Sequence, residues 1–226
     1  MHKFRTVIFD CDSTLSRIEG VEALASEYRS EVAALTEAAM SGAVPLEQVY
    51  GRRLDLIQPT PADLERVGRQ YVAERVPGVE NTIAKLRREG VAVRVISGGL
   101  RQAVLVLTRF LGLPDQDVAA VEVRFDAAGR YQGYDEDSPL ARAGGKEEVL
   151  RTWGRETPGP TMLVGDGATD LEAKDAVDLF VAYTGVVSRP AVVAGADVVL
   201  DELSLEPVVG LALGQTDETP RTDIKA

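Results

Sequence analysis

Short apolar runs that end abruptly at a polar residue or a glycine turn are the feature of this sequence that most restricts its fold. Four such runs occur, at residues 6–9, 91–96, 162–164 and 179–183. Segments with apolar residues at helical spacing alternate with them. Runs that are apolar on both faces are typical of parallel strands covered by helices on each side. We therefore expect an α/β fold with a doubly wound parallel sheet.

The same patterns predict how the rest of the chain is organised. Helices are expected at residues 79–89, 100–111, 146–153, 171–176 and 203–213. Residues 118–125 and 131–134 resemble the two strands of a β-hairpin. The stretch 15–76 offers only helical patterns, at 21–28, 31–40, 46–57 and 62–73, and so predicts a helical insertion after the first strand. Residues 215–226 are polar and are expected to form a flexible tail.

Composition limits the partners of the chain. Its 226 residues carry 25 Lys and Arg against 36 Asp and Glu, a formal net charge of −11. This charge repels nucleic-acid phosphates and anionic lipid headgroups, so we expect neither nucleic acid nor a membrane as partner. A phosphorylated substrate would also be repelled, unless local positive charge or a metal attracts it.

Cysteine content and hydropathy indicate the compartment. Cys11 is the single cysteine of the sequence, which therefore has no intrachain disulfide. No stretch approaches the ~18 apolar residues of a membrane span, and none has the form of a signal peptide. We therefore expect a protein of the reducing cytoplasm.

Two carboxylates stand two residues apart in Asp10-Cys11-Asp12-Ser13-Thr14, directly after the first apolar run. Both would be costly at the end of a buried strand without a cation or strong hydrogen bonds. A carboxylate that attacks phosphorus forms an aspartyl-phosphate, and a second one can protonate the leaving alcohol and then activate water. A turn rich in aspartate and serine explains the same residues without chemistry.

Three more groups of residues would meet this motif at the carboxyl edge of the sheet. The sequence GDGATD at 165–170 supplies two carboxylates, and oxygen ligands of this kind suit Mg²⁺. Ser97-Gly98-Gly99 could hold phosphate oxygens at a helix N-terminus, and Lys146 could neutralise a phosphoryl group. Each also has an ordinary explanation: a loop with Asp170 at a helix N-terminus, a glycine turn, and a solvated lysine.

Other motifs for phosphate or nucleophilic chemistry are absent from the sequence. A P-loop would need glycine where Leu140 stands and serine or threonine where Glu147 stands. The dinucleotide fingerprint would need a third glycine where the 165–170 motif has Asp170. A histidine-based triad is not expected, because the single histidine, His2, lies at the second position of the sequence.

Together, DCDST at 10–14, Ser97-Gly98-Gly99, Lys146 and GDGATD at 165–170 occur in the order and spacing of the haloacid dehalogenase superfamily, and the chain resembles its phosphoserine phosphatase family. The resemblance extends from about residue 6 to residue 213. It implies a catalytic α/β core of residues 1–14 and 77–214, with the insertion at 15–76 as a helical cap.

The resemblance also implies roles for individual residues. Asp10 would be the nucleophile and Asp12 the general acid and base, with Lys146 as the third catalytic residue. Mg²⁺ would be held by the Asp10 carboxylate, the Asp12 carbonyl group and Asp166, supported by Asp170. The residues that would bind the substrate are Glu19, Met40, Arg53, Ser97, Gly98, Gly99 and Thr169. Two positions near them depart from the related pattern: Ser41 replaces a glycine, and Leu46 a larger aromatic residue.

The resulting hypothesis is a Mg²⁺-dependent phosphomonoesterase that converts O-phospho-L-serine to L-serine and phosphate through an aspartyl-phosphate. It would act on this small molecule as a monomer or homodimer. Two alternatives stay open. One is a phosphatase or phosphotransferase of the same superfamily acting on another small phosphoester; the other is a non-catalytic signalling module that carries phosphate on aspartate.

Overall fold

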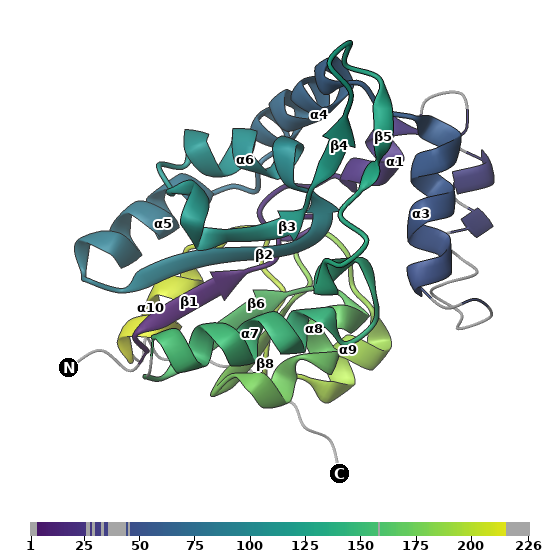
Figure 1. The fold of residues 1–226 in the computed structure, drawn as a ribbon. Helices are drawn as coiled ribbons and strands as arrows, with labels where there is room; N and C mark the ends of the chain where they lie inside the picture. Colours follow the sequence, from purple (N-terminus) through teal and green to yellow (C-terminus); the bar gives the residue numbers. More distant parts are fainter. Residues whose placement is uncertain are drawn as a thin grey trace.

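A six-stranded parallel sheet forms the centre of the molecule (Figure 1). The computed structural model describes residues 4–25, 28, 30–32, 34–35, 44, 46–157 and 159–215. The sheet order is β3-β2-β1-β6-β7-β8, and every neighbouring pair is parallel. The strands are β1 (Thr6–Phe9), β2 (Ala92–Leu100), β3 (Val118–Val121), β6 (Thr161–Gly165), β7 (Leu179–Tyr183) and β8 (Val198–Leu200). The predicted doubly wound α/β fold is confirmed.

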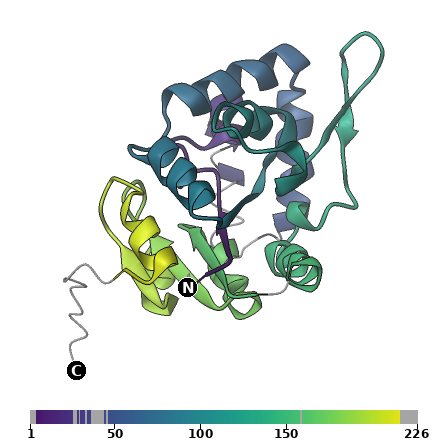
Figure 2. The same cartoon turned by 90° about the vertical axis from the view of Figure 1, so that its left-hand side faces the viewer.

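Helices cover both faces of this sheet (Figures 1 and 2). One face carries α5 (Val79–Arg88), α6 (Arg101–Phe110) and α10 (Pro207–Leu213). The other carries α7 (Gly145–Glu156), α8 (Ala168–Glu172) and, beside α8, α9 (Pro190–Gly195). Short 3-10 helices lie at η2 (Asp115–Asp117), η3 (Pro139–Ala141) and η4 (Lys174–Ala176).

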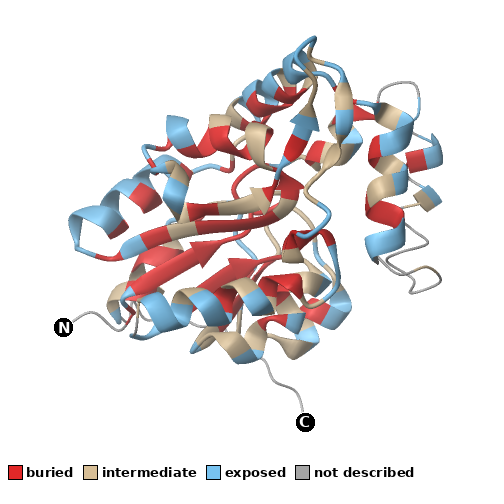
Figure 3. Cartoon of the chain, viewed as in Figure 1, coloured by how far each residue is buried: buried red, intermediate tan, exposed pale blue. Residues whose placement is uncertain are grey.

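The core lies between the sheet and these helices, and buried residues follow the central strands (Figure 3). All four residues of β1 are buried. Helix α5 buries Val79, Thr82, Ile83 and Leu86, a spacing that places them on one face of a helix. The apolar pattern of the sequence therefore has a direct counterpart in the layers of the fold.

The chain between β1 and α5 contains the helices α1 (Gly20–Leu24), α3 (Leu46–Ile57) and α4 (Pro61–Ala73), and residues 30–32 and 34–35 are helical as well. The helix at 46–57 has its expected bounds, and α4 begins one residue early because Thr60 and Asp63 form a capping box before Pro61. Helix α1 is shorter than the expected 21–28, and the helix expected at 31–40 lies largely outside the described residues.

The chain leaves the core and returns to it at adjacent places. Ser16 pairs with Arg75 in an antiparallel bridge, and the Val76 N–H donates to the Leu15 carbonyl oxygen at 2.9 Å. Helix α4 then packs closely on α6, since a Cβ at Gly68 would lie 2.5 Å from Val106. This helix is thus held both by the returning chain and by the core.

The prediction of a β-hairpin formed by residues 118–125 and 131–134 is wrong for the first part of residues 118–125. Residues 118–121 form β3, which joins the main sheet beside β2, and only β4 (Val123–Phe125) pairs with β5 (Tyr131–Tyr134). The Arg101 guanidinium donates to the Val118 carbonyl oxygen and to Asp115, which holds the start of β3 beside α6. The apolar run therefore divides between two sheets.

The bounds of several other elements also differ from the expectations. Strand β2 continues through Ser97, Gly98 and Gly99 to Leu100, so these residues are extended and do not open a helix. The expected helix at 171–176 is divided into α8 and η4, and the one at 203–213 begins at Pro207. Strand β8 and helix α9 were not expected, because both are short and their sequences are similarly apolar.

Candidate active site

Three buried carboxylates meet at the carboxyl edge of the sheet. Asp10 follows β1 and Asp166 follows β6, which are neighbours in the sheet, and Asp170 lies in the first turn of α8. One oxygen of each carboxylate lies within 4.8 Å of the other two. The sheet therefore brings together residues that are about 160 positions apart in the sequence.

Lys146 lies between two of these carboxylates. Its Nζ is 3.0 Å from Asp10 Oδ1 and 2.6 Å from Asp170 Oδ1, and the side chain is buried at the start of α7. Burial lowers the pKa of Lys146, but Asp10 and Asp170 outweigh burial and raise it above its ordinary value. Lys146 is therefore a permanent cation beside Asp10.

Asp170 is the most deeply buried carboxylate of the group. Burial and the charge of Asp10 raise its pKa to about 7, although Lys146 and the Gly167 N–H, 3.0 Å from Oδ2, both favour the charged form. A Cβ at Gly165 would lie 2.3 Å from the Asp170 carboxyl carbon. Glycine at 165 thus allows Asp170 to approach the end of β6.

Arg189 is a residue of this site that the sequence analysis missed. It precedes α9, and its guanidinium contacts the Asp166 carboxylate, whose other oxygen accepts from the Thr14 hydroxyl at 3.0 Å. It also lies 3.9 Å from the Glu19 carboxylate. A single arginine before a proline has no motif around it, so nothing in the sequence distinguishes it from an exposed charge.

The residues of this edge fit a divalent cation. In the described part of the chain, two cations, Lys146 and Arg189, contact three buried carboxylates, those of Asp10, Asp166 and Asp170. Burying this excess negative charge is costly without a further positive charge. Carboxylate oxygens within 4.8 Å of one another are ligands for a hard divalent ion.

Asp12 points away from this cluster, toward the helices before α5. Its Oδ1 accepts two hydrogen bonds, from the Gly20 N–H at 2.7 Å and from the Tyr71 hydroxyl at 2.6 Å. Burial and the nearby Glu19 raise the pKa of Asp12 to about 7, so both of its protonation states are populated near neutral pH. Ser13, the next residue, has a left-handed backbone with φ of 52°, which turns the chain here.

The Ser97–Gly99 segment lies beside Asp12. The Ser97 hydroxyl is buried and accepts from the Gly99 N–H at 2.9 Å, while the Gly98 carbonyl accepts from the Tyr50 hydroxyl of α3 at 2.9 Å. A Cβ at Gly99 would lie 2.9 Å from Asp12 Oδ2, so a side chain at 99 would displace this carboxylate. The helix expected at 100–111 begins at Arg101, and the segment before it is a strand whose glycines allow close approach.

Of the other predicted site residues, only some are shown to lie near the Asp10–Thr14 motif. Glu19 accepts from the Ser13 hydroxyl at 2.6 Å, and burial raises its pKa. Arg53 lies on α3, 5.5 Å from the centre of the Tyr50 ring. Thr169 lies in α8, where its hydroxyl is close to Gly167. Met40 and Ser41 lie outside the described residues.

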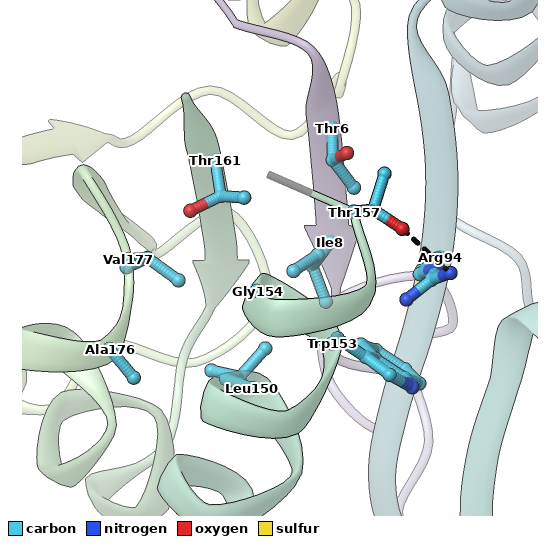
Figure 4. A pocket seen from close by; sticks show the side chains of 10 residues that line it. All are labelled: Thr6, Ile8, Arg94, Leu150, Trp153, Gly154, Thr157, Thr161, Ala176 and Val177. Atoms are coloured by element: carbon cyan, nitrogen blue, oxygen red, sulfur yellow. Dashed lines mark hydrogen bonds between the residues drawn. The ribbon is translucent and has the colours of Figure 1, made fainter. Parts of the chain in front are cut away.

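Cys11 and Trp153 take no part in this site. Cys11 is fully buried, and burial together with Asp12 and Asp10 raises the pKa of its thiol. Trp153 lies near the opposite end of the strands, with the Arg94 guanidinium 4.9 Å above its ring (Figure 4). A small cavity is lined by Trp153, Arg94, Thr6 and Thr161, among others. Its volume is about 10 Å³, which is enough for about one water molecule.

The comparisons with known proteins agree with this geometry. The family of haloacid dehalogenase-like hydrolases matches residues 4–177. The chloroplastic phosphoserine phosphatase of Arabidopsis thaliana is 38% identical over 84% of this chain and 66% of its own length, just under two thirds. The human phosphoserine phosphatase is 36% identical over 82% of this chain and 84% of its own length.

Solved structures extend this likeness to three dimensions. A phosphoserine phosphatase with an analogue of a phospho-aspartyl intermediate has a TM-score of 0.76 at 26% identity, covering 92% of this chain and 98% of its own. A substrate-bound phosphoserine phosphatase complex has a TM-score of 0.78 with the same identity and coverage. The chain therefore belongs to the haloacid dehalogenase-like hydrolases, in the phosphoserine phosphatase family, as its motifs predicted.

Among the described residues, none of the helices has both the length and the apolar character of a membrane span.

Proposed function

We propose that this protein is a Mg²⁺-dependent phosphomonoesterase that hydrolyses O-phospho-L-serine to L-serine and phosphate. The observation that carries the proposal is the position of the Asp10 carboxylate, held beside a buried lysine and two further carboxylates, with Asp12 two residues away. The names of the Arabidopsis and human relatives support phosphoserine as the substrate.

In the first step, an Asp10 oxygen attacks the phosphorus atom of the ester. The bond between phosphorus and the serine oxygen breaks, and the protonated Asp12 gives its proton to that oxygen, so serine leaves as an alcohol. Lys146 stabilises negative charge on Asp10 and on the phosphoryl oxygens throughout this transfer.

In the second step, Asp12 is a carboxylate and removes a proton from water. The resulting hydroxide attacks phosphorus, the bond from phosphorus to Asp10 breaks, and phosphate leaves. Asp12 is then protonated and Asp10 is a carboxylate again, as at the start. Mg²⁺, when bound, supplies positive charge that offsets the charge of the phosphoryl group. Its ligands would be the Asp10 and Asp166 carboxylates and the Asp12 carbonyl, supported by Asp170.

Substrate binding divides between two parts of the chain. Ser97, Gly98, Gly99 and Thr169 bind the phosphoryl group from the core, formed by residues 1–14 and 77–214. Residues 15–76 act as a cap, where Glu19 pairs with the ammonium group, Arg53 binds the carboxylate and Met40 contacts the substrate. Closure of the cap excludes bulk water from the reacting phosphoryl group.

The setting that goes with this function is small-molecule metabolism in the cytoplasm. The acidic net charge of −11 and the single buried cysteine support this inference. The enzyme acts as a monomer or homodimer, without nucleic acid or membrane as partner.

Phosphate release with Mg²⁺ from a panel of small phosphoesters tests the proposal. The panel contains L- and D-phosphoserine, phosphothreonine, phosphoethanolamine, acetyl phosphate and a sugar phosphate, with Asp10→Asn as the control. We expect a strong preference for O-phospho-L-serine and no turnover by the variant. Faster phosphate release from another ester would contradict the assignment of phosphoserine as the substrate. Activity retained by Asp10→Asn would contradict the assignment of Asp10 as the nucleophile. A stable phospho-enzyme without release would favour the signalling alternative.

A further inference from the structure

Tyr71 is a fully buried residue in contact with the reaction machinery, and the mechanism above does not use it. It lies on α4, and its hydroxyl is 2.6 Å from Asp12 Oδ1. The Gly20 N–H reaches the same oxygen at 2.7 Å. In the described part of the chain, no hydrogen bond reaches the other oxygen, Oδ2.

The other oxygen, Oδ2, faces the Ser97–Gly99 segment. A Cβ at Gly99 would stand 2.9 Å from Asp12 Oδ2 and 3.0 Å from the Ser97 hydroxyl oxygen. Oδ2 is therefore directed at the segment that is proposed to hold the phosphoryl group. Because both donors hold Oδ1, the carboxyl group cannot exchange its two oxygens without losing two hydrogen bonds at once.

The support behind Tyr71 is rigid. One helical turn before it, Gly68 packs against α6 so closely that a Cβ would meet Val106 at 2.5 Å and the Ala103 carbonyl oxygen at 2.9 Å. On the other side, a Cβ at Gly20 would lie 1.9 Å from the Tyr71 hydroxyl oxygen. Helix α4 is thus packed tightly on the core helix α6, and the Tyr71 hydroxyl lies against the backbone of α1.

We propose that Tyr71 is a positioning residue that, together with the Gly20 N–H, holds Asp12 Oδ1 so that Oδ2 exchanges protons with the reacting ester and water. This inference rests on the proposed function, since it assumes that Asp12 transfers protons. It assigns to α4 a task in the reaction itself, beyond that of covering the site.

The chemistry of the leaving group separates this role from a structural one. The serine of phosphoserine would leave as a strongly basic alkoxide unless its oxygen receives a proton. Cleavage of this alkyl ester therefore depends on a correctly positioned general acid. Acetyl phosphate releases acetate, which needs no proton. Poor positioning of Asp12 should therefore slow the transfer from phosphoserine and leave the transfer from acetyl phosphate nearly unchanged.

The test compares Tyr71→Phe with the wild type and with Tyr183→Phe. Tyr183 is also fully buried and donates its hydroxyl to a main-chain oxygen, that of Leu203, at 2.7 Å, so it controls for the loss of a buried hydrogen bond. The measured quantities are kcat and KM for O-phospho-L-serine, and kcat/KM for acetyl phosphate, which reports the steps up to formation of the phospho-enzyme.

For Tyr71→Phe we expect kcat on phosphoserine to fall about 10- to 100-fold, a part of the ~10² to 10⁴ that general acid–base catalysis contributes. KM and the acetyl phosphate reaction should stay within about 3-fold of the wild type, and Tyr183→Phe should match the wild type in both reactions.

Three results would overturn the inference: an unchanged kcat, a rise in KM alone, or an equal loss on both substrates, which would mark a structural role. Turnover of acetyl phosphate also shows that the variant is folded. A wild type that releases phosphate from no ester at all would instead refute the proposed function, so the two failures are distinguishable.

Discussion

The ion pairs of Lys146 give this residue a structural role beside its proposed chemical one. Its ammonium group is removed from water between Asp10 and Asp170, and it is the group that offsets their charge. Breaking a buried ion pair from one side leaves an uncompensated charge and typically costs ~3–5 kcal/mol, whereas an exposed pair contributes ~0–1 kcal/mol.

Replacing Lys146 should therefore lower stability as well as activity. We expect Lys146→Met to lower the free energy of unfolding by ~3 kcal/mol, measured by urea denaturation, and to abolish phosphate release. Arg151→Met is the matched control, because Arg151 lies on the same helix and forms an exposed pair with Glu147 at 2.6 Å. Equal losses in the two variants would contradict a special role for the buried pair.

At the scale of elements, α3 and the end of β2 are joined by one side chain. Tyr50 donates its hydroxyl to the Gly98 carbonyl, while its ring lies under Arg53 and 5.1 Å from the Tyr134 ring. It stands one helical turn after Leu46. The hydrogen bond thus links the helix of Arg53 to the segment proposed to bind phosphate.

Removing this link should weaken substrate binding. In Tyr50→Phe the ring contacts remain and one hydrogen bond is lost, so closure over the substrate becomes less favourable by ~0.5–1.5 kcal/mol. We expect KM for O-phospho-L-serine to rise ~2- to 10-fold in steady-state kinetics, with kcat nearly unchanged. Tyr134→Phe is the control and should retain the wild-type KM. A Tyr50→Phe enzyme with an unaltered KM would show that the bond does not contribute to closure.

At the scale of the whole molecule, the excess of negative charge extends from the surface to the site. The chain carries a net charge of −11, and the buried carboxylates of the site outnumber the cations that contact them in the described part of the structure. A ligand that binds only the folded state stabilises it by mass action. A divalent cation should therefore stabilise the whole protein.

Thermal unfolding with and without Mg²⁺ measures this effect. At a Mg²⁺ concentration ten times the dissociation constant, binding should add ~1.4 kcal/mol and raise the unfolding midpoint by a few degrees, and EDTA should reverse it. Asp166→Asn should abolish the shift, while Asp201→Asn, at an exposed position, should retain it. A shift of the same size in Asp166→Asn would place the ion elsewhere.

Local patterns in the sequence predict the layers of the fold and the edge of the sheet at which the motif residues meet. Apolar runs that end at Asp10, Ser97 and Asp166 predict buried parallel strands, and the carboxyl ends of such strands must meet at one edge. Strand periodicity and motif spacing are local properties, so they can be read without knowledge of the packing. Short elements such as β8 and α9 were not predicted, because their few residues show no clear hydrophobic periodicity.

Which other side chains reach these residues depends on how the elements pack together. Tyr71 follows Leu64 and Val67 at helical spacing, so in the sequence it is indistinguishable from a packing residue. The packing of α4 on α6 brings its hydroxyl to Asp12, and the return of the chain after β7 brings Arg189 to Asp166. Periodicity specifies which face of a helix is buried, but the partner of that face depends on contacts between residues far apart in the chain.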